Sequence, residues 1–203
     1  MLPVFETSAT LLAVTAGLAY LLGSVPFGLV MARLFGLGDI RQIGSGNIGA
    51  TNVLRTGNKP AAALTLLLDA GKGGIAVLIA RYAMAEDAAQ IAGFAAFLGH
   101  CFPIFLGFKG GKGVATFLGT LLALFWPAGI AACLTWLATA AISRISSLSA
   151  LVAAALSPVW ISVFGMPSAG VATALLAALI FMRHDANIKR LIAGEEPRIG
   201  RKG

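Results

Sequence analysis

The sequence predicts an all-α integral membrane protein with about seven transmembrane helices. Of its 203 residues, 58% are hydrophobic and only 11% are charged, and the mean hydropathy is +0.89. A soluble domain carries about 25% charged residues, so a chain this apolar is expected to lie in lipid. Each span needs about 20 apolar residues, which leaves room for about six to eight helices and only short loops. We therefore expect a single polytopic membrane domain over residues 1–203.

The first apolar run, residues 11–30, is interpreted as a retained helix. No positively charged residue precedes it, whereas a secretory signal begins with a basic region and has a shorter core. Glu6 precedes this run and Arg33 and Arg41 follow it, so the positive-inside rule places the N-terminus outside the cytoplasm. The predicted spans are Leu11–Val30, Pro60–Tyr82, Ala88–Phe108, Val114–Trp126, Gly129–Ile142, Leu148–Phe164 and Ala169–Met182.

Two of these spans are short, and the break at Trp126-Pro127 fits either a tight hairpin or one longer helix with a proline kink. Counting them separately gives seven spans and a cytoplasmic C-terminus. Of the fifteen Lys and Arg residues, all except Lys72 and Arg81, that is thirteen, then fall on the cytoplasmic side. Six spans would move Arg144 and the basic C-terminal cluster outward, against the positive-inside rule.

Two functional classes are disfavoured by composition. The formal charge of +7 is spread over several short loops without aromatic interleaving, so membrane topology explains it better than nucleic-acid binding does. Cys101 and Cys133 both fall in apolar segments, where cysteine behaves as a small buried hydrophobe. We therefore expect neither a disulfide nor a metal site.

The stretch FKGGKGVAT, residues 108–116, is the strongest candidate for an anion site. Glycines let backbone N–H groups converge, lysines add positive charge, and a helix beginning at Val114 would add its dipole. The spacing of an ATP-binding P-loop fails, because Leu106 and Gly113 stand where glycine and a hydroxyl residue are needed. We expect this loop at the cytoplasmic membrane surface. Its candidate ligands are Lys109, Gly110, Gly111, Lys112 and Gly113.

The first cytoplasmic loop contains GSGNIGATN, residues 44–52, followed by Arg55. It matches the dinucleotide fingerprint G-x-G-x-x-G, but that fingerprint needs a βαβ unit and this loop lies between membrane helices. Its glycines, hydroxyls, amides and guanidinium suit a polyol phosphate. The alternative is a polar loop with turn glycines.

Asp69 and Lys72 lie deep within the second span, about 14 to 18 Å from its Pro60 end. Each ionisable group at that depth costs about 2.5 to 3.5 kcal/mol unless it is paired or faces water. At i,i+3 spacing they fit a structural ion pair, or Lys72 lines an aqueous pocket open to the cytoplasm. The neighbouring glycines allow a break in the helix or the close approach of another backbone.

Further polar groups occur near the later spans. The turn containing Ser147 and Ser149 offers hydroxyls that serve as helix caps or ligands. His184 and Asn187 share one face just beyond the last span, where the alternative is a basic helix that contacts anionic lipid. His100, on an apolar helix, is expected to be a hydrogen-bonded core residue.

In sequence, the chain resembles the bacterial acyl-phosphate:glycerol-3-phosphate acyltransferases of the inner membrane. The resemblance is carried by GSGNIGATN with Arg55, LDAGKG at 68–73, GHCFPIF running into FKGGKGVAT, SSLS, and RHDANIKRL followed by Gly194 and Glu196. These motifs occur in the family's order and cover nearly the whole chain. The resemblance implies seven helices around a cytoplasm-facing site. There an acyl phosphate acylates the sn-1 hydroxyl of glycerol 3-phosphate, giving lysophosphatidic acid without coenzyme A, carrier protein or metal.

Motifs and residues together give an expected site. We expect catalytic roles for Ser45, Lys112, His184 and Asn187, with His184 acting either as a general base or only to orient a substrate. On the residues alone an anion transporter is the alternative, but the polar groups gather on one face. The expected partners are the two substrates and the bilayer, with no cofactor, metal, nucleic acid or protein partner. The expected substrate-binding residues are Arg55, Lys72, Lys109, Gly110, Gly111, Gly113, Ser147, Ser149 and Glu196, with the choice between the two serines left open.

Overall fold

The computed structural model describes residues 4–200, and within that range every regular element is a helix. The predicted all-α class is therefore confirmed. Short 3-10 turns cover Ile40–Gln42, Ile104–Leu106 and Pro167–Ala169. The α-helices are α1 (Ala9–Gly23), α2 (Phe27–Leu34), α3 (Ala50–Leu54), α4 (Lys59–Ala83), α5 (Glu86–Cys101), α6 (Val114–Leu124), α7 (Trp126–Ser143), α8 (Ser146–Val163), α9 (Gly170–Arg183) and α10 (Asp185–Ile192).

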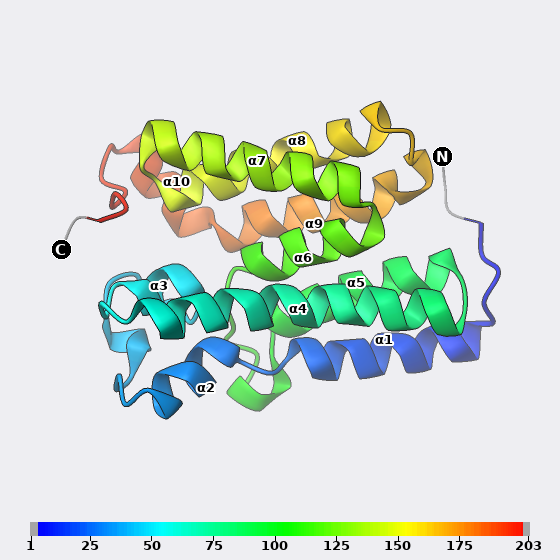
Figure 1. Cartoon of the computed structure of the whole chain (residues 1–203), viewed down its shortest axis with the longest axis horizontal. Helices are drawn as coiled ribbons and strands as arrows, with labels where there is room; N and C mark the ends of the chain where they lie inside the picture. Colours follow the sequence, from blue (N-terminus) through cyan, green and yellow to red (C-terminus); the bar gives the residue numbers. More distant parts are fainter. Residues whose placement is uncertain (1–3, 201–203) are drawn as a thin grey trace.

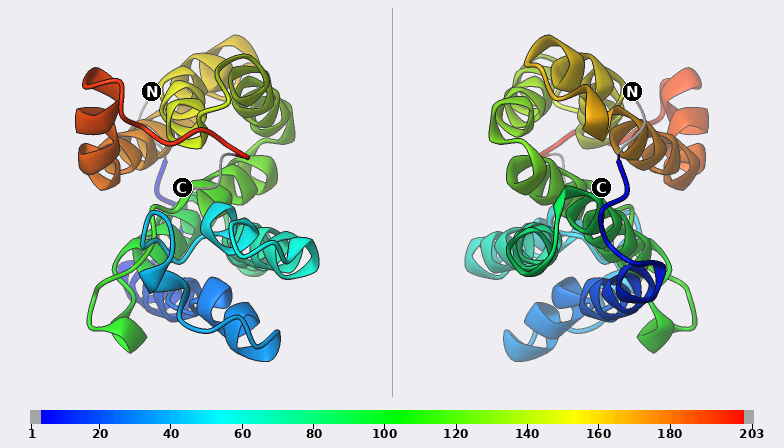
Figure 2. Two further views of the ribbon diagram at one scale, coloured as in Figure 1. Left: turned by 90° about the vertical axis from the view of Figure 1, so that its left-hand side faces the viewer. Right: turned by 90° about the vertical axis from the view of Figure 1, so that its right-hand side faces the viewer.

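The long helices run along the long axis of one bundle (Figure 1). Helices α1, α4 and α5 form one half, α7, α8 and α9 form the other, and α6 lies between the halves (Figures 1 and 2). The segment that precedes α1 and the segment that follows α10 lie at opposite ends. One end holds α3, α10 and the α7–α8 turn, so the first polar loop, the serine turn and the C-terminal polar segment gather there (Figure 1).

Helix length tests the predicted number of spans. Five described segments are long and apolar enough to cross a membrane, and a sixth arises if Pro167–Arg183 is joined to Asp185–Ile192 across a 64° bend. Helix α6 is shorter, because its 11 residues extend only about 16 Å of a hydrocarbon core about 30 Å thick. The integral membrane class is supported, while seven complete spans and the orientation of the termini remain predictions.

Glycines bring α6 against α4. A Cβ on Gly73 would lie 2.6 Å from the Thr120 hydroxyl and 2.7 Å from the Thr116 carbonyl oxygen, and Gly119 faces the Ala70 backbone in return. Small residues at helix interfaces in membranes allow such close backbone approach. Of the two roles open to the glycines near Lys72, close packing is the one observed, since α4 runs unbroken through them.

The Trp126-Pro127 break forms a tight hairpin and not a kink. Helix α6 ends at Leu124, Phe125 is extended at φ −154° and ψ 94°, and α7 begins at Trp126. Pro127 is placed in the first turn of α7, where its missing N–H leaves no helical hydrogen bond unmade. Gly129 lets the two helices cross closely, because a Cβ there would lie 2.5 Å from Leu122 Cα.

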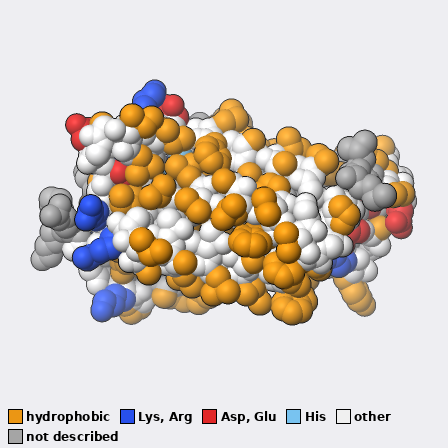
Figure 3. Space-filling view, turned by 90° about the horizontal axis from the view of Figure 1, so that it is seen from above, with side chains coloured by type: hydrophobic (Ala, Val, Ile, Leu, Met, Phe, Trp, Pro, Cys, Tyr) orange, Lys and Arg blue, Asp and Glu red, His pale blue; other side chains and the backbone are white. Residues whose placement is uncertain are grey.

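The hydrophobic and basic side chains on the surface are distributed unevenly along the long axis of the bundle. The face shown in Figure 3 is largely hydrophobic along the middle of the molecule, and its Lys and Arg side chains gather mainly at the end that holds the polar loops. An apolar belt with a basic end is the pattern expected of a bilayer-spanning bundle whose basic end faces the cytoplasm.

Candidate active site

The first polar loop is built around Asn52. This side chain is buried and donates from Nδ2 to the carbonyl oxygens of Ile40, at 2.6 Å, and Asn47, at 2.7 Å. Its Oδ1 accepts from the Ser45 N–H at 3.2 Å and from Arg55 Nη1 at 3.4 Å. Asn52 therefore sets the positions of both predicted ligands in this loop, and their side chains remain exposed.

Gly44 makes room for Arg55. Gly44 has φ +56°, and a Cβ there would lie 2.6 Å from Arg55 Cδ and Nη1. A side chain at this position would both strain the backbone and displace the guanidinium. Of the three glycines that mimic a dinucleotide fingerprint, this one has a clear steric reason.

The lysine–glycine stretch forms the loop that enters α6. Gly113 is the N-cap residue at φ +77°. Glycine has no side chain to cap a helix, and the first N–H groups of a helix lack intrahelical acceptors. Together with the positive end of the helix dipole, these groups suit an anion.

The backbone of this loop is fixed from two sides. The Gly111 N–H donates to the His100 carbonyl oxygen at 3.1 Å. Arg183 donates from Nε to the Gly111 carbonyl oxygen at 3.1 Å and from Nη2 to that of Gly110 at 3.0 Å. The Gly111 amide is therefore already used, which removes it from the predicted set of anion-binding N–H groups. Lys112, the N–H groups of Gly110 and Gly113, and the start of α6 remain in that set.

The loop lies deeper along the bundle than a position at the end that holds α3 and α10. Thr116 in the first turn of α6 donates to the carbonyl oxygen of Asp69, at 2.9 Å. Asp69 is ten residues beyond Lys59 in α4, about 15 Å along that helix. The reason is that α5 ends at Cys101, seven residues before the predicted end of its span at Phe108. The anion loop is therefore recessed into the bundle.

A chain of hydrogen bonds joins this loop to the C-terminal segment. Lys112 Nζ donates to Asn187 Oδ1, and Asn187 Nδ2 donates to Glu196 Oε1. The same Glu196 carboxylate accepts from the Ser147 hydroxyl at 2.7 Å and from Arg190 Nε at 2.7 Å. Four of the predicted site residues, on three separate segments of the sequence, thus meet in one network.

A cavity of about 230 Å³ connects this network to the first loop. Ser45 and Arg55 line it from one side, and Arg190 and Glu196 line it from the other. Two guanidinium groups face it beside one carboxylate, and Lys112 is one hydrogen-bonded residue away, so its surroundings favour an anionic molecule. Among the described residues, no cluster of three or more His, Cys, Asp or Glu is placed to hold a metal ion.

Burial changes the proton affinity of Lys112 and Glu196. Burial lowers the pKa of Lys112 to about 8, even though the nearby Glu196 carboxylate acts in the opposite direction. Burial alone would raise the pKa of Glu196, but hydrogen bonds from Ser147, Asn187 and Arg190 outweigh it and hold that pKa below its usual range. At neutral pH the network therefore pairs a charged lysine with a charged carboxylate.

His184 lies buried at the junction of α9 and α10. Its Nδ1 is 2.7 Å from the Ile180 carbonyl oxygen, and a carbonyl only accepts, so Nδ1 carries the proton and Nε2 is left with the lone pair. Burial lowers the pKa of His184 to about 4. The imidazole is therefore neutral near pH 7 and binds a proton weakly.

Three predicted ligands lie away from this network. Lys72 is buried, with Nζ 2.8 Å from Asp69 Oδ1 and 2.9 Å from the Val25 carbonyl oxygen, which is the structural ion pair and not a pocket wall. Ser149 is fully buried and its hydroxyl donates to the Ile145 carbonyl oxygen at 2.9 Å, so of the two serines only Ser147 reaches the network. Lys109 is exposed ahead of the loop.

Sequence reasoning missed two organising arginines. Arg183 holds the carbonyl side of the anion loop, and Arg190 lines the cavity, whereas the sequence indicates only that both belong to the basic C-terminal cluster. The sequence identifies Asn52 as one of the amides of its loop but does not show that it is the buried centre of that loop. The available signal was position, since Arg183 immediately precedes the predicted His184 and Asn187 pair.

At the opposite end of the bundle, the charged side chains make structural contacts. Arg81 pairs with Glu86 at 2.7 Å and donates to the Leu124 carbonyl oxygen at 2.8 Å. Asp87 accepts from the N–H groups of Glu6, at 3.0 Å, and Thr7, at 2.8 Å. Arg81, the cation at this end, is therefore already paired with a carboxylate and a backbone carbonyl.

Fold and site together define an integral membrane protein with a cation-lined cavity suited to an anionic molecule. A model of the glycerol-3-phosphate acyltransferase family matches residues 13–194. A glycerol-3-phosphate acyltransferase from Jannaschia sp. strain CCS1 is 72% identical over 201 residues, covering 99% of each chain. One from Cereibacter sphaeroides strain ATCC 17025 is 65% identical and covers 99% of this chain and 96% of its own.

Solved structures agree with these relatives. The crystal structure of PlsY, an integral membrane glycerol 3-phosphate acyltransferase, in its glycerol 3-phosphate form has a TM-score of 0.88 at 41% identity, covering 93% of this chain and 96% of that one. The lysophosphatidic acid form has a TM-score of 0.85 at 38% identity, covering 93% and 95%. The chain belongs to the glycerol-3-phosphate acyltransferase family and is an acyltransferase, which decides against the transporter alternative.

Proposed function

We propose that the protein transfers a fatty acyl group from an acyl phosphate to the sn-1 hydroxyl of glycerol 3-phosphate, which yields lysophosphatidic acid and inorganic phosphate. The observation that carries this proposal is the link from Lys112 through Asn187 to Glu196, because it joins the recessed anion loop to the arginine-lined cavity. The glycerol 3-phosphate and lysophosphatidic acid forms of the solved PlsY structure support the choice of acceptor and product.

Two adjacent anion sites match two phosphorylated substrates. One phosphate binds at Lys112 and the N-terminus of α6, and the other binds in the cavity beside Ser45 and Arg55, with Arg190 opposite. Asn187 lies between the two sites and orients the groups that meet there. Lys109 attracts substrate from an exposed position and is the more dispensable of the two lysines.

The reaction needs alignment more than activation, because an acyl phosphate is already a reactive anhydride. The sn-1 oxygen attacks the carbonyl carbon, a new ester C–O bond forms, and the bond from the carbonyl carbon to the phosphate oxygen breaks. Lys112 and the backbone N–H groups at the start of α6 stabilise the negative charge that develops. The leaving phosphate takes the hydroxyl proton, so no metal or other cofactor enters the balance.

His184 orients a substrate in this scheme and does not act as the general base. With a pKa of about 4 its imidazole is a weak proton acceptor near neutral pH. Its Nε2 lone pair, fixed by the hydrogen bond of Nδ1 to Ile180, instead accepts a hydrogen bond from a substrate hydroxyl. The buried imidazole thus has a role that does not depend on its titration.

The distribution of Lys and Arg residues supports a membrane location and an orientation for the protein. We place the protein in the bacterial inner membrane as a multi-pass protein, with the cavity end in the cytoplasm and the N-terminus outside. The thirteen Lys and Arg residues assigned to the cytoplasmic side support this orientation. The reaction requires the two substrates and the bilayer, without a nucleic acid or protein partner.

The test is an assay of purified protein in lipid with palmitoyl phosphate and labelled glycerol 3-phosphate. Labelled lysophosphatidic acid should form with palmitoyl phosphate and not with palmitoyl coenzyme A. An Arg55→Ala variant, checked for folding by its thermal unfolding, should lose most of the activity because a cavity cation is gone. Product formed from the coenzyme A ester alone would overturn the proposed donor.

A further inference from the structure

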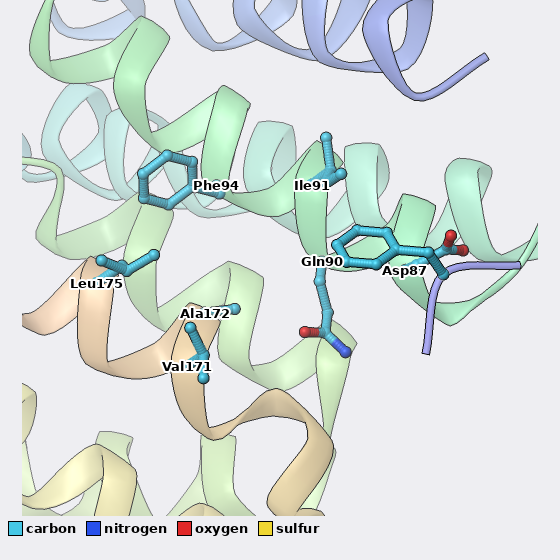
Figure 4. Close-up of a pocket in the computed structure, with 8 residues that line it drawn as sticks. Asp87, Gln90, Ile91, Phe94, Val171, Ala172 and Leu175 are labelled. Carbon is cyan, nitrogen blue, oxygen red and sulfur yellow. The ribbon is translucent and has the colours of Figure 1, made fainter. Parts of the chain in front are cut away.

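A second cavity, of about 160 Å³, lies between α5 and α9 near the end of the bundle opposite the active site. Phe94 and Ile91 approach it from α5, and Val171, Ala172 and Leu175 approach it from α9 (Figure 4). Its walls are almost entirely apolar although Asp87 and Gln90 border it. An apolar hollow next to lipid fits a hydrocarbon chain and not a polar ligand.

The two helices that form this cavity both lead to the recessed anion loop. Helix α5 ends beside it, where the His100 carbonyl oxygen accepts the Gly111 N–H. Along α9, Val171, Leu175, Leu179 and Arg183 are spaced four residues apart, so they lie on one face of the helix. Arg183 donates to the carbonyl oxygens of the loop. A fatty chain whose carbonyl lies at the anion loop can therefore follow α5 and α9 toward the cavity.

Partly exposed apolar side chains continue along this path. On α5 they are Phe94 and Leu98, and Phe102 follows just beyond the helix, 5.1 Å beneath the Arg183 guanidinium. On α9 Leu175 is half exposed and Leu179 is partly buried. These side chains offer contacts to a chain that lies along the two helices without requiring the core behind them to open.

The distance from the end of α5 to the cavity matches the length of a fatty chain. Phe94 lies seven residues and Asp87 fourteen residues before Cys101, so the cavity extends from about 10 Å to about 21 Å from the end of α5. Two fatty chains end to end fill a hydrocarbon core about 30 Å thick, so one chain reaches about 15 Å. A long chain that starts at the anion loop would end inside the cavity.

The N-terminal segment closes the far end of this path. Asp87 accepts hydrogen bonds from the backbone N–H groups of Glu6 and Thr7 and from the Thr7 hydroxyl, at 2.8 to 3.0 Å, and Phe5 lines the cavity beside it. In Figure 2 this segment, in blue before α1, passes near the beginnings of α5 and α9. A fatty chain that extended further would meet the buried Asp87 carboxylate and the N-terminal segment that donates hydrogen bonds to it.

We propose that the fatty chain of the acyl donor lies along α5 and α9 with its methyl end in this cavity, and that Phe5 and Asp87 form a stop that limits chain length. The inference rests on the proposed function, since it assigns the donor's chain to the same site. The N-terminal segment is then a determinant of chain-length specificity, although it lies far along the bundle from the reacting groups.

The test compares acyl phosphates from decanoyl to stearoyl. Ala172→Phe fills the cavity, so kcat/KM for palmitoyl phosphate should fall by about fourfold for each methylene that no longer fits, while decanoyl phosphate is unaffected. The matched control is Ala138→Phe on the exposed face of α7, which should keep the wild-type profile. Phe5→Ala should raise the rate with stearoyl phosphate relative to palmitoyl phosphate.

If Ala172→Phe does not fold, Val171→Phe serves instead, because Val171 also lines the cavity and is 41% exposed, so a larger side chain there does not disturb the core. Chain-length profiles that are the same for folded cavity variants, the control and the wild type would overturn the proposal while leaving the proposed function intact. Failure of the wild-type protein to use an acyl phosphate of any length would instead overturn the proposed function.

Discussion

The imidazole of His100 occupies the space that a side chain on Gly111 would need, and the backbone of the same histidine accepts the Gly111 N–H at 3.1 Å. His100 Nδ1 in turn lies 3.5 Å from Asp69 Oδ1 on α4. The anion loop is thus seated against a side chain that two helices hold. Gly111 has an ordinary backbone φ, so it is glycine for space rather than for backbone freedom.

This contact predicts the effect of Gly111→Ala. The added methyl must displace His100 or the loop, so KM for a phosphorylated substrate should rise by tenfold or more. Combining it with His100→Ala should recover part of the loss, because the obstructing ring is gone. Gly71→Ala is the control, since nothing lies within 4 Å of a Cβ there and the helix accepts alanine. Steady-state kinetics measure KM for each variant. A double variant whose KM is as high as that of Gly111→Ala would refute the steric explanation.

The buried pair of Asp69 and Lys72 predicts a stability effect without a binding effect. Lys72→Met leaves the Asp69 carboxylate without its closest counter-charge, which should cost about 3–5 kcal/mol of unfolding free energy. Adding Asp69→Asn should return much of that stability. Thermal unfolding in detergent measures both, and KM for glycerol 3-phosphate should stay unchanged in the folded protein. A raised KM with unchanged stability would show that Lys72 faces substrate after all.

Much of the fold could be predicted because apolar runs mark helices directly. The predicted span Pro60–Tyr82 became Lys59–Ala83, and Leu148–Phe164 became Ser146–Val163. The early end of α5 at Cys101 could not be read from hydropathy, because the residues that follow, including Phe102 and Phe105, are as apolar as the helix itself. Composition does not distinguish an apolar loop from the end of a span.

The site was predictable where the chemistry is local. Lys112, Asn187 and Glu196 stand in polar motifs, and the structure brings them together. The tertiary contacts could not be predicted. The Gly111 N–H donates to the His100 carbonyl oxygen, and the Arg183 side chain points inward to the carbonyl oxygens of the loop. The choice between the two serines was settled by helix geometry, because Ser149 bonds back to Ile145 within its own turn whereas Ser147 faces Glu196.

Glu196 is expected to act mainly on stability. Glu196→Gln replaces one acceptor oxygen with a donor amide, so it cannot satisfy Ser147, Asn187 and Arg190 together and should cost about 1–3 kcal/mol at neutral pH. Because the folded-state pKa is lowered from 4.5, the stabilisation is present above that value and is lost as pH falls through the lowered pKa. The difference in Tm between variant and wild type should therefore shrink in acid; a difference that persists unchanged at low pH would count against the ionised form.

His184 variants test whether a proton is transferred to it. Since its pKa is about 4, the wild-type kcat should show no inflection attributable to this histidine between pH 6 and 8. Gln keeps a hydrogen-bonding amide near the position of Nε2, so His184→Gln should retain at least tenfold more activity than His184→Ala. Equal losses in both variants, together with a wild-type titration near neutrality, would identify His184 as the general base.

Lys112 predicts how substrate binding depends on pH. With a pKa of about 8, it is charged at neutral pH and loses its proton as pH rises above 8, while the substrate phosphate, with a second pKa near 6, stays doubly ionised. KM for a phosphorylated substrate should therefore rise between pH 8 and about 9.5. Lys112→Arg carries a charge that does not titrate in this range, so its KM, although higher at pH 7 because the guanidinium fits differently, should stay flat. If both proteins show the same rise, the titrating group is not Lys112.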